Sequence, residues 1–183
     1  MIKNRRIILC KKQLDDAVND YMWKTDPELA KLDACQPLDM SFNEYLYIYI
    51  NELQMSPIVK HEFSIATLNG EHIGNCAYYN INYFKGEAEV GIMLGNRKYW
   101  NQGYGAEAML MLVDYIYNKH NFKRVYLKTL DYNVRAQHCF IKCGFTPCGT
   151  KKQDGHSFIV MEMAREKWQS VKEAMSSVSA EER

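Results

Sequence analysis

Two glycines, Gly103 and Gly105, stand directly before the most regular amphipathic segment of the chain. Glycine lets the backbone approach a ligand closely because it has no Cβ. The first N–H groups of a helix lack partners inside the helix and attract anions. These residues therefore indicate an anion site suited to a pyrophosphate, with an ordinary glycine turn as the alternative. The apolar residues of the helix recur at i, i+3, i+4, i+7, i+10 and i+11; they are Ala106, Met109, Leu110, Val113, Ile116 and Tyr117.

Three strands are predicted ahead of this turn, over residues 62–68, 72–83 and 87–94. The Asn69-Gly70 pair is a strong hairpin signal between the first two, and Gly86 marks the next turn. The third segment alternates, which places successive side chains on opposite faces of a strand. Ala88, Val90, Ile92 and Leu94 should share one face, and Glu87, Glu89, Gly91 and Met93 the other.

The N-terminal part is predicted to hold one strand, over residues 5–10, and two helices. Apolar residues after the strand recur at helical spacing, and Asp26-Pro27 ends that helix. Residues 41–44 form a capping box that starts a second helix, with Pro57 beyond its end. The periodic residues are Leu14, Val18, Tyr21 and Met22 in the first helix; in the second, Tyr45, Leu46, Ile48, Tyr49 and Leu53 should face inward.

The C-terminal part is predicted to begin with a strand over residues 125–129. Asn133 then caps a helix that ends at Gly144 and buries Ala136, Phe140 and Cys143. Residues 145–150 and 157–163 should form two closing strands. This order of elements predicts an α/β (α+β) protein with a mixed sheet. At 183 residues, the chain fits one domain of ordinary size.

Composition narrows the classes of function. Lys and Arg total 23 and Asp and Glu total 22, so the net charge of +1 gives no overall field to attract nucleic acid or an anionic membrane. No apolar run approaches the length of a membrane span, and we expect a cytoplasmic protein. The six cysteines form no Cys-x-x-Cys pair, so we expect reduced thiols and no metal site.

Two nucleotide-binding motifs are disfavoured. The spacing Gly103-x-Gly105-x-x-Ala108 satisfies a dinucleotide fingerprint in form, but residues 95–102 separate it from the preceding strand and further strands come first. A Walker loop would require Gly-Lys-Ser/Thr, which is absent here.

The chain resembles the GNAT superfamily of N-acetyltransferases in two blocks. The run WNQGYG (100–105) is similar to the family motif Gln/Arg-x-x-Gly-x-Gly/Ala, with Trp in the first position, and its longer context resembles the RimJ/RimL branch. The run NVRAQHCFIKCGF (133–145) is similar to the block Asn-x-x-Ala-x-x-x-Tyr-x-x-x-Gly-Phe, with Phe140 in place of Tyr.

The resemblance implies a mostly antiparallel sheet of about seven strands flanked by helices and splayed between the fourth and fifth strands. It implies a single acyl-CoA N-acyltransferase domain over residues 1–175, followed by a polar, frayed tail over 176–183. Acetyl-CoA would be the co-substrate, without a metal. The acceptor would be a primary amine, on a protein N-terminus or a small molecule, attacking directly. Neither nucleic acid nor membrane is expected as a partner, and a homodimer, common in the family, is left open.

The resemblance also assigns the coenzyme contacts. The backbone of Met93 and Leu94 would hold the pantetheine arm, and an N–H near Met93 would stabilise the developing oxyanion. Asn133 would contact the arm from the other side, and Phe140 would pack beside the coenzyme. The coenzyme phosphates are assigned to Gln102, Gly103, Tyr104, Gly105 and Ala106.

Glu89 is the candidate base that deprotonates the amine. It lies 11 positions before Trp100, which resembles the spacing of the catalytic Glu in the histone acetyltransferase branch. The alternative is an ordinary polar residue on a solvated strand face. The position that holds the base in the RimI branch, five residues before Asn133, is Lys128, which argues against that mechanism. Tyr78, Asn80 and Tyr83 are the candidate acceptor-binding residues beside Glu89.

Phe140 departs from the family because a phenyl ring cannot protonate the leaving thiolate. A thiol with a pKa of about 8.5 leaves tolerably as the thiolate, and Cys139 or water could supply the proton. A catalytically impaired acyl-CoA-binding module is therefore the second functional class to consider.

Overall fold

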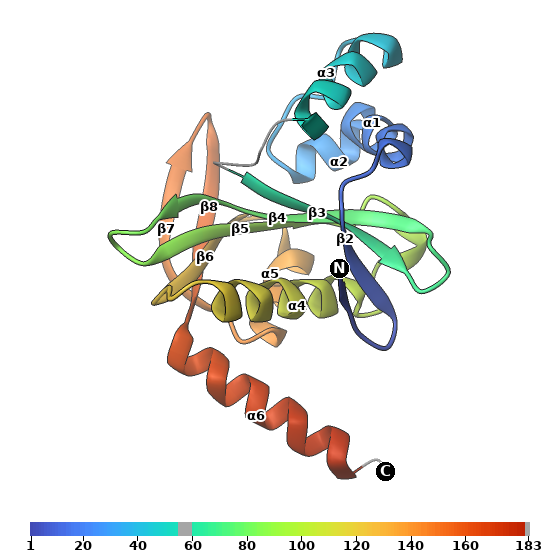
Figure 1. Cartoon of the computed structure of the whole chain (residues 1–183). Coiled ribbons are helices and arrows are strands. Elements are labelled where there is room, and N and C mark those ends of the chain that lie inside the picture. The colour runs from blue at the N-terminus through green and yellow to red at the C-terminus, as the bar shows by residue number, and fades with distance from the viewer. Residues whose placement is uncertain (55–59, 182–183) are drawn as a thin grey trace.

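The structure is a computed structural model that describes residues 1–54 and 60–181, with only the backbone described for 174–181 (Figure 1). Residues 14–16 (η1) and 97–99 (η2) form 3-10 turns. The other elements are β1 (Ile2–Lys3), β2 (Ile7–Lys11), α1 (Ala17–Thr25), α2 (Pro27–Leu32), α3 (Phe42–Gln54), β3 (Lys60–Thr67), β4 (His72–Asn82), β5 (Glu87–Met93), α4 (Tyr104–Lys119), β6 (Arg124–Leu130), α5 (Val134–Lys142), β7 (Thr146–Gln153), β8 (His156–Ala164) and α6 (Arg165–Glu181).

Within the described residues, eight strands form one sheet in the order β1-β2-β3-β4-β5-β6-β8-β7. The β5–β6 pair is parallel and the other neighbours are antiparallel. The predicted mixed, mostly antiparallel sheet is thus confirmed, with the two-residue β1 as an addition. None of the described helices is long and apolar enough to cross a bilayer.

Helices cover both faces of the sheet, with α4 and α5 on one face and α1, α2 and α3 on the other (Figure 1). The main core lies on the α4 side, where Met109, Val113 and Ile116 are fully buried as predicted. Each such side chain contributes about 1.5–3 kcal/mol through loss of apolar surface to water. The core also includes Ile7, Leu9, Ile65, Tyr78, Val90, Leu127 and Met161.

Most of the apolar residues predicted to form the buried face of α1 point to solvent instead. Leu14, Val18 and Met22 are all more than half exposed. The buried side chains are Ala17, Asp20 and Trp23. The reason is tertiary: the Trp23 ring occupies the space that a Cβ at Gly95 would fill, with Cδ2 at 1.9 Å from that position, and Asp20 joins a buried polar cluster.

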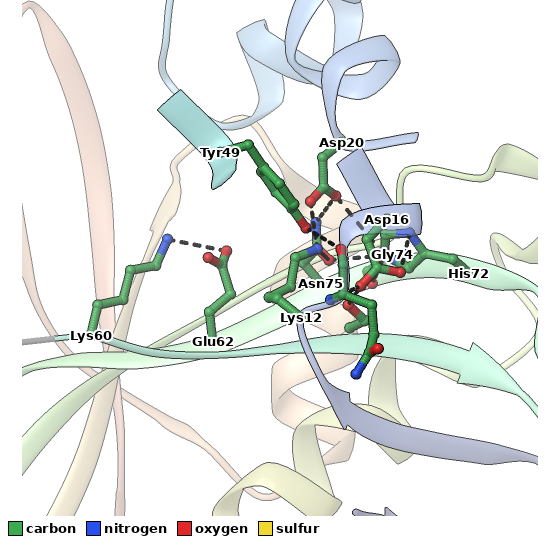
Figure 2. Close-up of polar contacts among 11 residues, drawn as sticks. Lys12, Asp16, Asp20, Tyr49, Lys60, Glu62, His72, Gly74 and Asn75 are labelled. Carbon is green, nitrogen blue, oxygen red and sulfur yellow. Dashed lines mark hydrogen bonds and ion pairs between the residues drawn. The ribbon is translucent and has the colours of Figure 1, made fainter. Parts of the chain in front are cut away.

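This cluster ties α1 to the sheet (Figure 2). Lys12 Nζ lies 2.5 Å from Asp20 Oδ2, and Asn75 Nδ2 donates to Asp20 Oδ1 at 2.6 Å. Asp16 Oδ2 accepts from Ser64 Oγ at 2.5 Å, and Asp16 Oδ1 lies 3.3 Å from Nδ1 of the buried His72. Buried charges persist when they are paired in this way.

The helix α2 is an element that the sequence analysis missed. Asp26 caps it by accepting from the backbone N–H groups of Glu28 and Leu29, each at 3.0 Å. Pro27 occupies the first turn, where its missing N–H costs nothing. Leu29 and Ala30 are buried, and Arg97 pairs with the Asp26 carboxylate at 2.8 Å. Asp26-Pro27 therefore ends one helix and also begins the next.

The capping box of α3 is confirmed, since Ser41 N donates to Glu44 Oε2 at 2.8 Å and Glu44 N to Ser41 Oγ at 3.4 Å. Its inward face is narrower than predicted. Tyr45 and Tyr49 are buried, whereas Ile48 and Leu53 are exposed. Pro57 lies outside the described residues. The helical backbone of α6 runs to Glu181, and fraying of the tail stays a prediction.

Candidate active site

The strands β5 and β6 pair over only three residues and then separate. Their register is Glu87 with Arg124, Ala88 with Val125 and Glu89 with Tyr126. Beyond Glu89, β5 stays paired with β4 as far as Met93, and β6 stays paired with β8 as far as Leu130. The edge of β5 from Val90 to Met93 therefore makes no ladder to β6. This is the predicted splay between the fourth and fifth long strands, and it leaves backbone groups available to an extended ligand.

The glycine turn starts α4 and is separated from the end of β5 by a segment that contains η2. Gly103 is the N-cap of α4 with φ +86°, a conformation that glycine adopts without strain. The first N–H groups of α4 have no acceptor within the helix and carry partial positive charge. The geometry of this turn fits an anionic group such as a pyrophosphate.

Arg6 fixes this turn from outside. Its guanidinium pairs with the Glu107 carboxylate in the first turn of α4, Nε donating to Oε1 at 2.7 Å. Its Nη1 donates to the Gln102 carbonyl at 3.2 Å, and its Cζ lies 4.5 Å from the centre of the Tyr104 ring. Hydrogen bonding to Glu107 is the main cause that raises the pKa of Arg6. Arg6, in the loop before β2, thus positions the turn and neutralises the Glu107 carboxylate beside it.

A cavity of about 500 Å³ joins the turn, the splayed strand, α5 and α2. This volume lies in the usual range for small-molecule sites. Seven of the predicted coenzyme-binding residues line it: Met93, Leu94, Gly103, Gly105, Ala106, Asn133 and Phe140. Gln102 and Tyr104 do not. Residues that were not predicted to contact the coenzyme complete the wall, and they are Leu29, Leu32, Asp33, Ile92, Tyr99, Trp100, Asn101, Arg135, Ala136, His138, Cys139 and Lys142.

Trp100, which stands where the family motif has Gln or Arg, closes one side of the cavity. Its Nε1 donates to the Leu94 carbonyl at 2.7 Å. The Arg135 guanidinium lies 3.4 Å from the centre of its ring, a cation–π arrangement. Desolvation lowers the pKa of Arg135. Trp100, the residue that differs from the family motif, thus links the end of β5 to the start of α5.

The helix α5 brings Asn133, Cys139 and Phe140 to the cavity. Asn133 caps the helix by accepting from Ala136 N at 3.2 Å, as predicted. Phe140 is buried and packs edge-on to Phe145, with ring centres 6.1 Å apart. A hydrogen bond from Cys143 is the first cause that lowers the pKa of Cys139, and the charges of Lys142 and Arg135 act in the same direction.

Glu89 is buried on the face opposite Ala88 and Val90, as the alternation predicted, but it is not solvated. Its Oε1 lies 3.2 Å from Lys128 Nζ, and its Oε2 accepts from Asn80 Nδ2 at 2.8 Å. Only 3% of the residue is exposed, and it does not line the cavity. The alternative of an ordinary residue on a solvated strand face is therefore wrong.

The structure places the predicted acceptor-binding residues elsewhere. Tyr78 is fully buried, stacks on His61 and reaches His120 Nε2 at 3.2 Å. Tyr83 is exposed and packs against His120. Asn80 supports Glu89. None of the three lines the cavity. Tyr78 is buried in the main core, Asn80 has φ +49° where the β4–β5 register is irregular, and Tyr83 lies beyond the end of β4.

The fold and the cleft define a class of protein, and comparison with known proteins identifies the family. The model of the acetyltransferase (GNAT) domain matches residues 6–146. An uncharacterized N-acetyltransferase p20 from Bacillus licheniformis is 32% identical over 124 residues, which cover 67% of this chain and 69% of the relative. The chain therefore belongs to the GNAT family and is an N-acetyltransferase.

Solved structures share the fold at low identity. Spermidine N-acetyltransferase from Vibrio cholerae, in complex with CoA and spermine, has a TM-score of 0.78 at 19% identity, covering 91% of this chain and 99% of its own. Aminoglycoside acetyltransferase AAC(6')-Ib in complex with coenzyme A has a TM-score of 0.74 at 18% identity, with the same coverage. A GNAT acetyltransferase from Bacillus anthracis has a TM-score of 0.75 at 16% identity, over 90% of this chain and 98% of its own.

Proposed function

We propose that this protein transfers the acetyl group of acetyl-CoA to a primary amine by direct attack of the amine on the thioester. The observation that carries the proposal is the cavity between the separated strands β5 and β6, with the glycine turn of α4 at its edge. Solved proteins of the same fold bind CoA together with an amine, spermine in one case and kanamycin in another.

The residues present fit the coenzyme. The N–H groups of residues 103–106 suit the diphosphate, and the unpaired edge of β5 suits the amides of the pantetheine arm. Gln102 and Tyr104, which do not line the cavity, contribute through their backbone. Asn133 and Phe140 lie across the cleft from β5 and flank the same arm.

Transfer of the acetyl group requires three contributions from this chain. A backbone N–H near Met93 stabilises the negative charge that develops on the carbonyl oxygen. A base takes a proton from the amine, because an alkyl amine has a pKa near 10.4 and is mostly protonated at neutral pH. Cys139, which lines the cavity, supplies a proton to the leaving sulfur in place of the missing phenol. Glu89 stays a predicted base, although Lys128 already neutralises its carboxylate.

The acceptor is a small-molecule amine or a protein N-terminus, and the RimJ/RimL-like context of residues 99–108 supports either. The shared fold with polyamine and aminoglycoside acetyltransferases favours the small molecule. A catalytically impaired acyl-CoA-binding module is the second candidate, and Phe140 is the observation that favours it.

Binding of acetyl-CoA to wild type and to Gly103→Glu, measured by calorimetry, tests the coenzyme site. Glutamate at this position places a negative charge and a strained backbone in the turn, so we expect binding at least tenfold weaker. Gly149→Glu is the matched control, since a Cβ there meets nothing within 4 Å. Equal binding by Gly103→Glu and Gly149→Glu would place the coenzyme elsewhere.

Thiol release from acetyl-CoA, followed with a panel of butylamine, spermidine, kanamycin and a peptide with a free N-terminus, tests the reaction. Release with any of them supports the transferase. Tight binding of acetyl-CoA without release on the whole panel supports the binding module.

A further inference from the structure

The charged groups that line the cavity are unevenly distributed. Arg135 and Lys142 lie on α5, the side assigned to the coenzyme. Asp33 lies across from them at the end of α2, and it is the only carboxylate among the described residues of the lining. The cavity therefore has a cationic side, on α5, and a side with a single negative group, Asp33. A cationic acceptor would be attracted to the Asp33 side.

The α2 helix holds Asp33 in place through its backbone. Asp33 is the C-cap residue, and its N–H donates to the carbonyl oxygens of Leu29 and Ala30 at 3.0 and 3.1 Å. Leu29 and Leu32, from the same helix, line the cavity beside it. A carboxylate next to two apolar side chains is suited to an ammonium group on an alkyl chain, because the charge and the methylenes each find a complementary surface.

The side chain of Asp33 keeps its charge available. Within residues 1–54 and 60–173, no Lys or Arg nitrogen lies within 4.0 Å of its carboxylate, whereas Glu89 has Lys128 at 3.2 Å. The Cys35 thiol is a close polar neighbour, with Sγ 4.0 Å from Oδ2. A carboxylate without a paired cation is able to bind an incoming ammonium without first losing a partner.

The surroundings also tune this carboxyl group. Its side chain lines the cavity and is exposed to solvent, and partial desolvation by the surrounding protein raises its pKa above the ordinary aspartate value. Lys60 on β3 and Lys24 on α1 oppose the shift. Cys35 in the following loop and Tyr79 on β4 also face it. A carboxyl with a raised pKa is a better proton acceptor near neutral pH.

We propose that Asp33 binds the ammonium group of the acceptor and takes its proton, which makes a primary alkylammonium the class of acceptor. The inference rests on the proposed function. The carboxylate accepts one N–H proton and frees the nitrogen lone pair, which forms the C–N bond as the C–S bond breaks. Cys139 gives its proton to the thiolate sulfur and takes back the second proton of the nitrogen, and Asp33 returns its proton to water. The overall products are the N-acetyl amine, CoA thiol and one released proton.

The test compares wild type, Asp33→Asn and Asp33→Glu with the best amine of the panel, across pH 5.5–9.5. We expect kcat/KM for the amine to fall about 100-fold in Asp33→Asn, the lower range for loss of a general base, and to recover in part in Asp33→Glu. The KM for acetyl-CoA should change less than twofold. Asp154→Asn, at the exposed turn between β7 and β8, is the matched control for the same change of charge.

The pH profile separates proton transfer from a structural role. In the wild type, log kcat/KM should be level between the pKa of Asp33 and that of the amine, since ammonium and carboxylate coexist there. In Asp33→Asn it should rise with unit slope towards the pKa of the amine, because only the free amine reacts. A mutant that keeps the level region, or keeps wild-type kcat/KM, overturns the inference.

The experiments distinguish failure of the proposed acetyl transfer from failure of the proposed role of Asp33. If the wild type binds acetyl-CoA and acetylates an amine, and Asp33→Asn does so equally well, only the role of Asp33 falls. If the wild type releases no thiol with any amine of the panel, the proposed reaction falls and takes this inference with it. Thermal unfolding of each variant measures whether it is folded.

Discussion

Glu89 and Lys128 form a buried ion pair, with Oε1 3.2 Å from Nζ, at the point where β5 and β6 begin to separate. The pair comes from two strands whose ladder ends at Glu89, so it joins them across the start of the cleft. Asn80 and Tyr79 also donate to the carboxylate, at 2.8 and 3.5 Å. These contacts explain why the carboxylate of Glu89 can be buried at this position.

We predict that Glu89→Gln lowers the free energy of unfolding by about 2 kcal/mol, because it leaves the ammonium of Lys128 without its anion in a mostly buried site. Urea unfolding measures the change. Glu62→Gln is the control, since Glu62 forms an exposed pair with Lys60 at 3.1 Å and such pairs contribute about 0–1 kcal/mol. Equal loss in both variants would contradict the prediction. If Glu89 is instead the base, Glu89→Gln removes the level region of the pH profile.

We predict that Arg6→Ala weakens acetyl-CoA binding about tenfold and leaves kcat nearly unchanged. Removal of the guanidinium frees the Glu107 carboxylate beside the diphosphate, where like charges repel, and loosens the Gln102 carbonyl. Calorimetry and steady-state kinetics measure the two effects. Arg5→Ala removes the same charge from an exposed neighbour and should change neither. Unchanged affinity in Arg6→Ala would show that the turn needs no external support.

We predict that iodoacetamide modifies Cys139 faster than Cys35 or Cys148 at pH 7. The pKa of Cys139 is lowered, so its thiolate persists to lower pH, whereas desolvation raises the pKa of the two exposed thiols. Mass spectrometry of the digested protein identifies the modified residue. Cys143→Ala removes the hydrogen-bond donor to the thiolate and should move alkylation of Cys139 to higher pH. Acetyl-CoA should protect Cys139, and faster labelling of Cys148 would contradict this ranking.

We predict that Phe140→Tyr raises kcat, by up to about tenfold, because the phenol restores a proton donor to the leaving sulfur. The gain is limited, since a thiolate already leaves tolerably near neutral pH. Phe145→Tyr is the matched control: Phe145 is the buried neighbour of Phe140 and does not line the cavity. It should lower stability without raising kcat. No gain in Phe140→Tyr would mean that sulfur protonation does not limit turnover.

Much of the coenzyme side of the site was predictable because its signals are local. The glycine turn, the helix that follows it and the Asn133 cap each depend on residues within a few positions of one another. The structure brings Met93, Gly103 and Phe140 to one cavity, as the resemblance implied. The acceptor side was not predictable in the same way. Asp26-Pro27 was interpreted only as a helix end, so α2 and Asp33 were missed.

The sequence by itself determined the order of the long strands and of α4 and α5, the apolar face of α4 and the turn that starts it, since hydrophobic period and glycine position act within one segment. Tertiary structure decided which face of α1 is buried, where β5 leaves β6 and what Glu89 contacts. The apolar stripe of α1 stays exposed because Trp23 against Gly95, and Asp16 and Asp20 in their polar cluster, outweigh it. These outcomes depend on contacts between residues far apart in the chain, which no local pattern encodes.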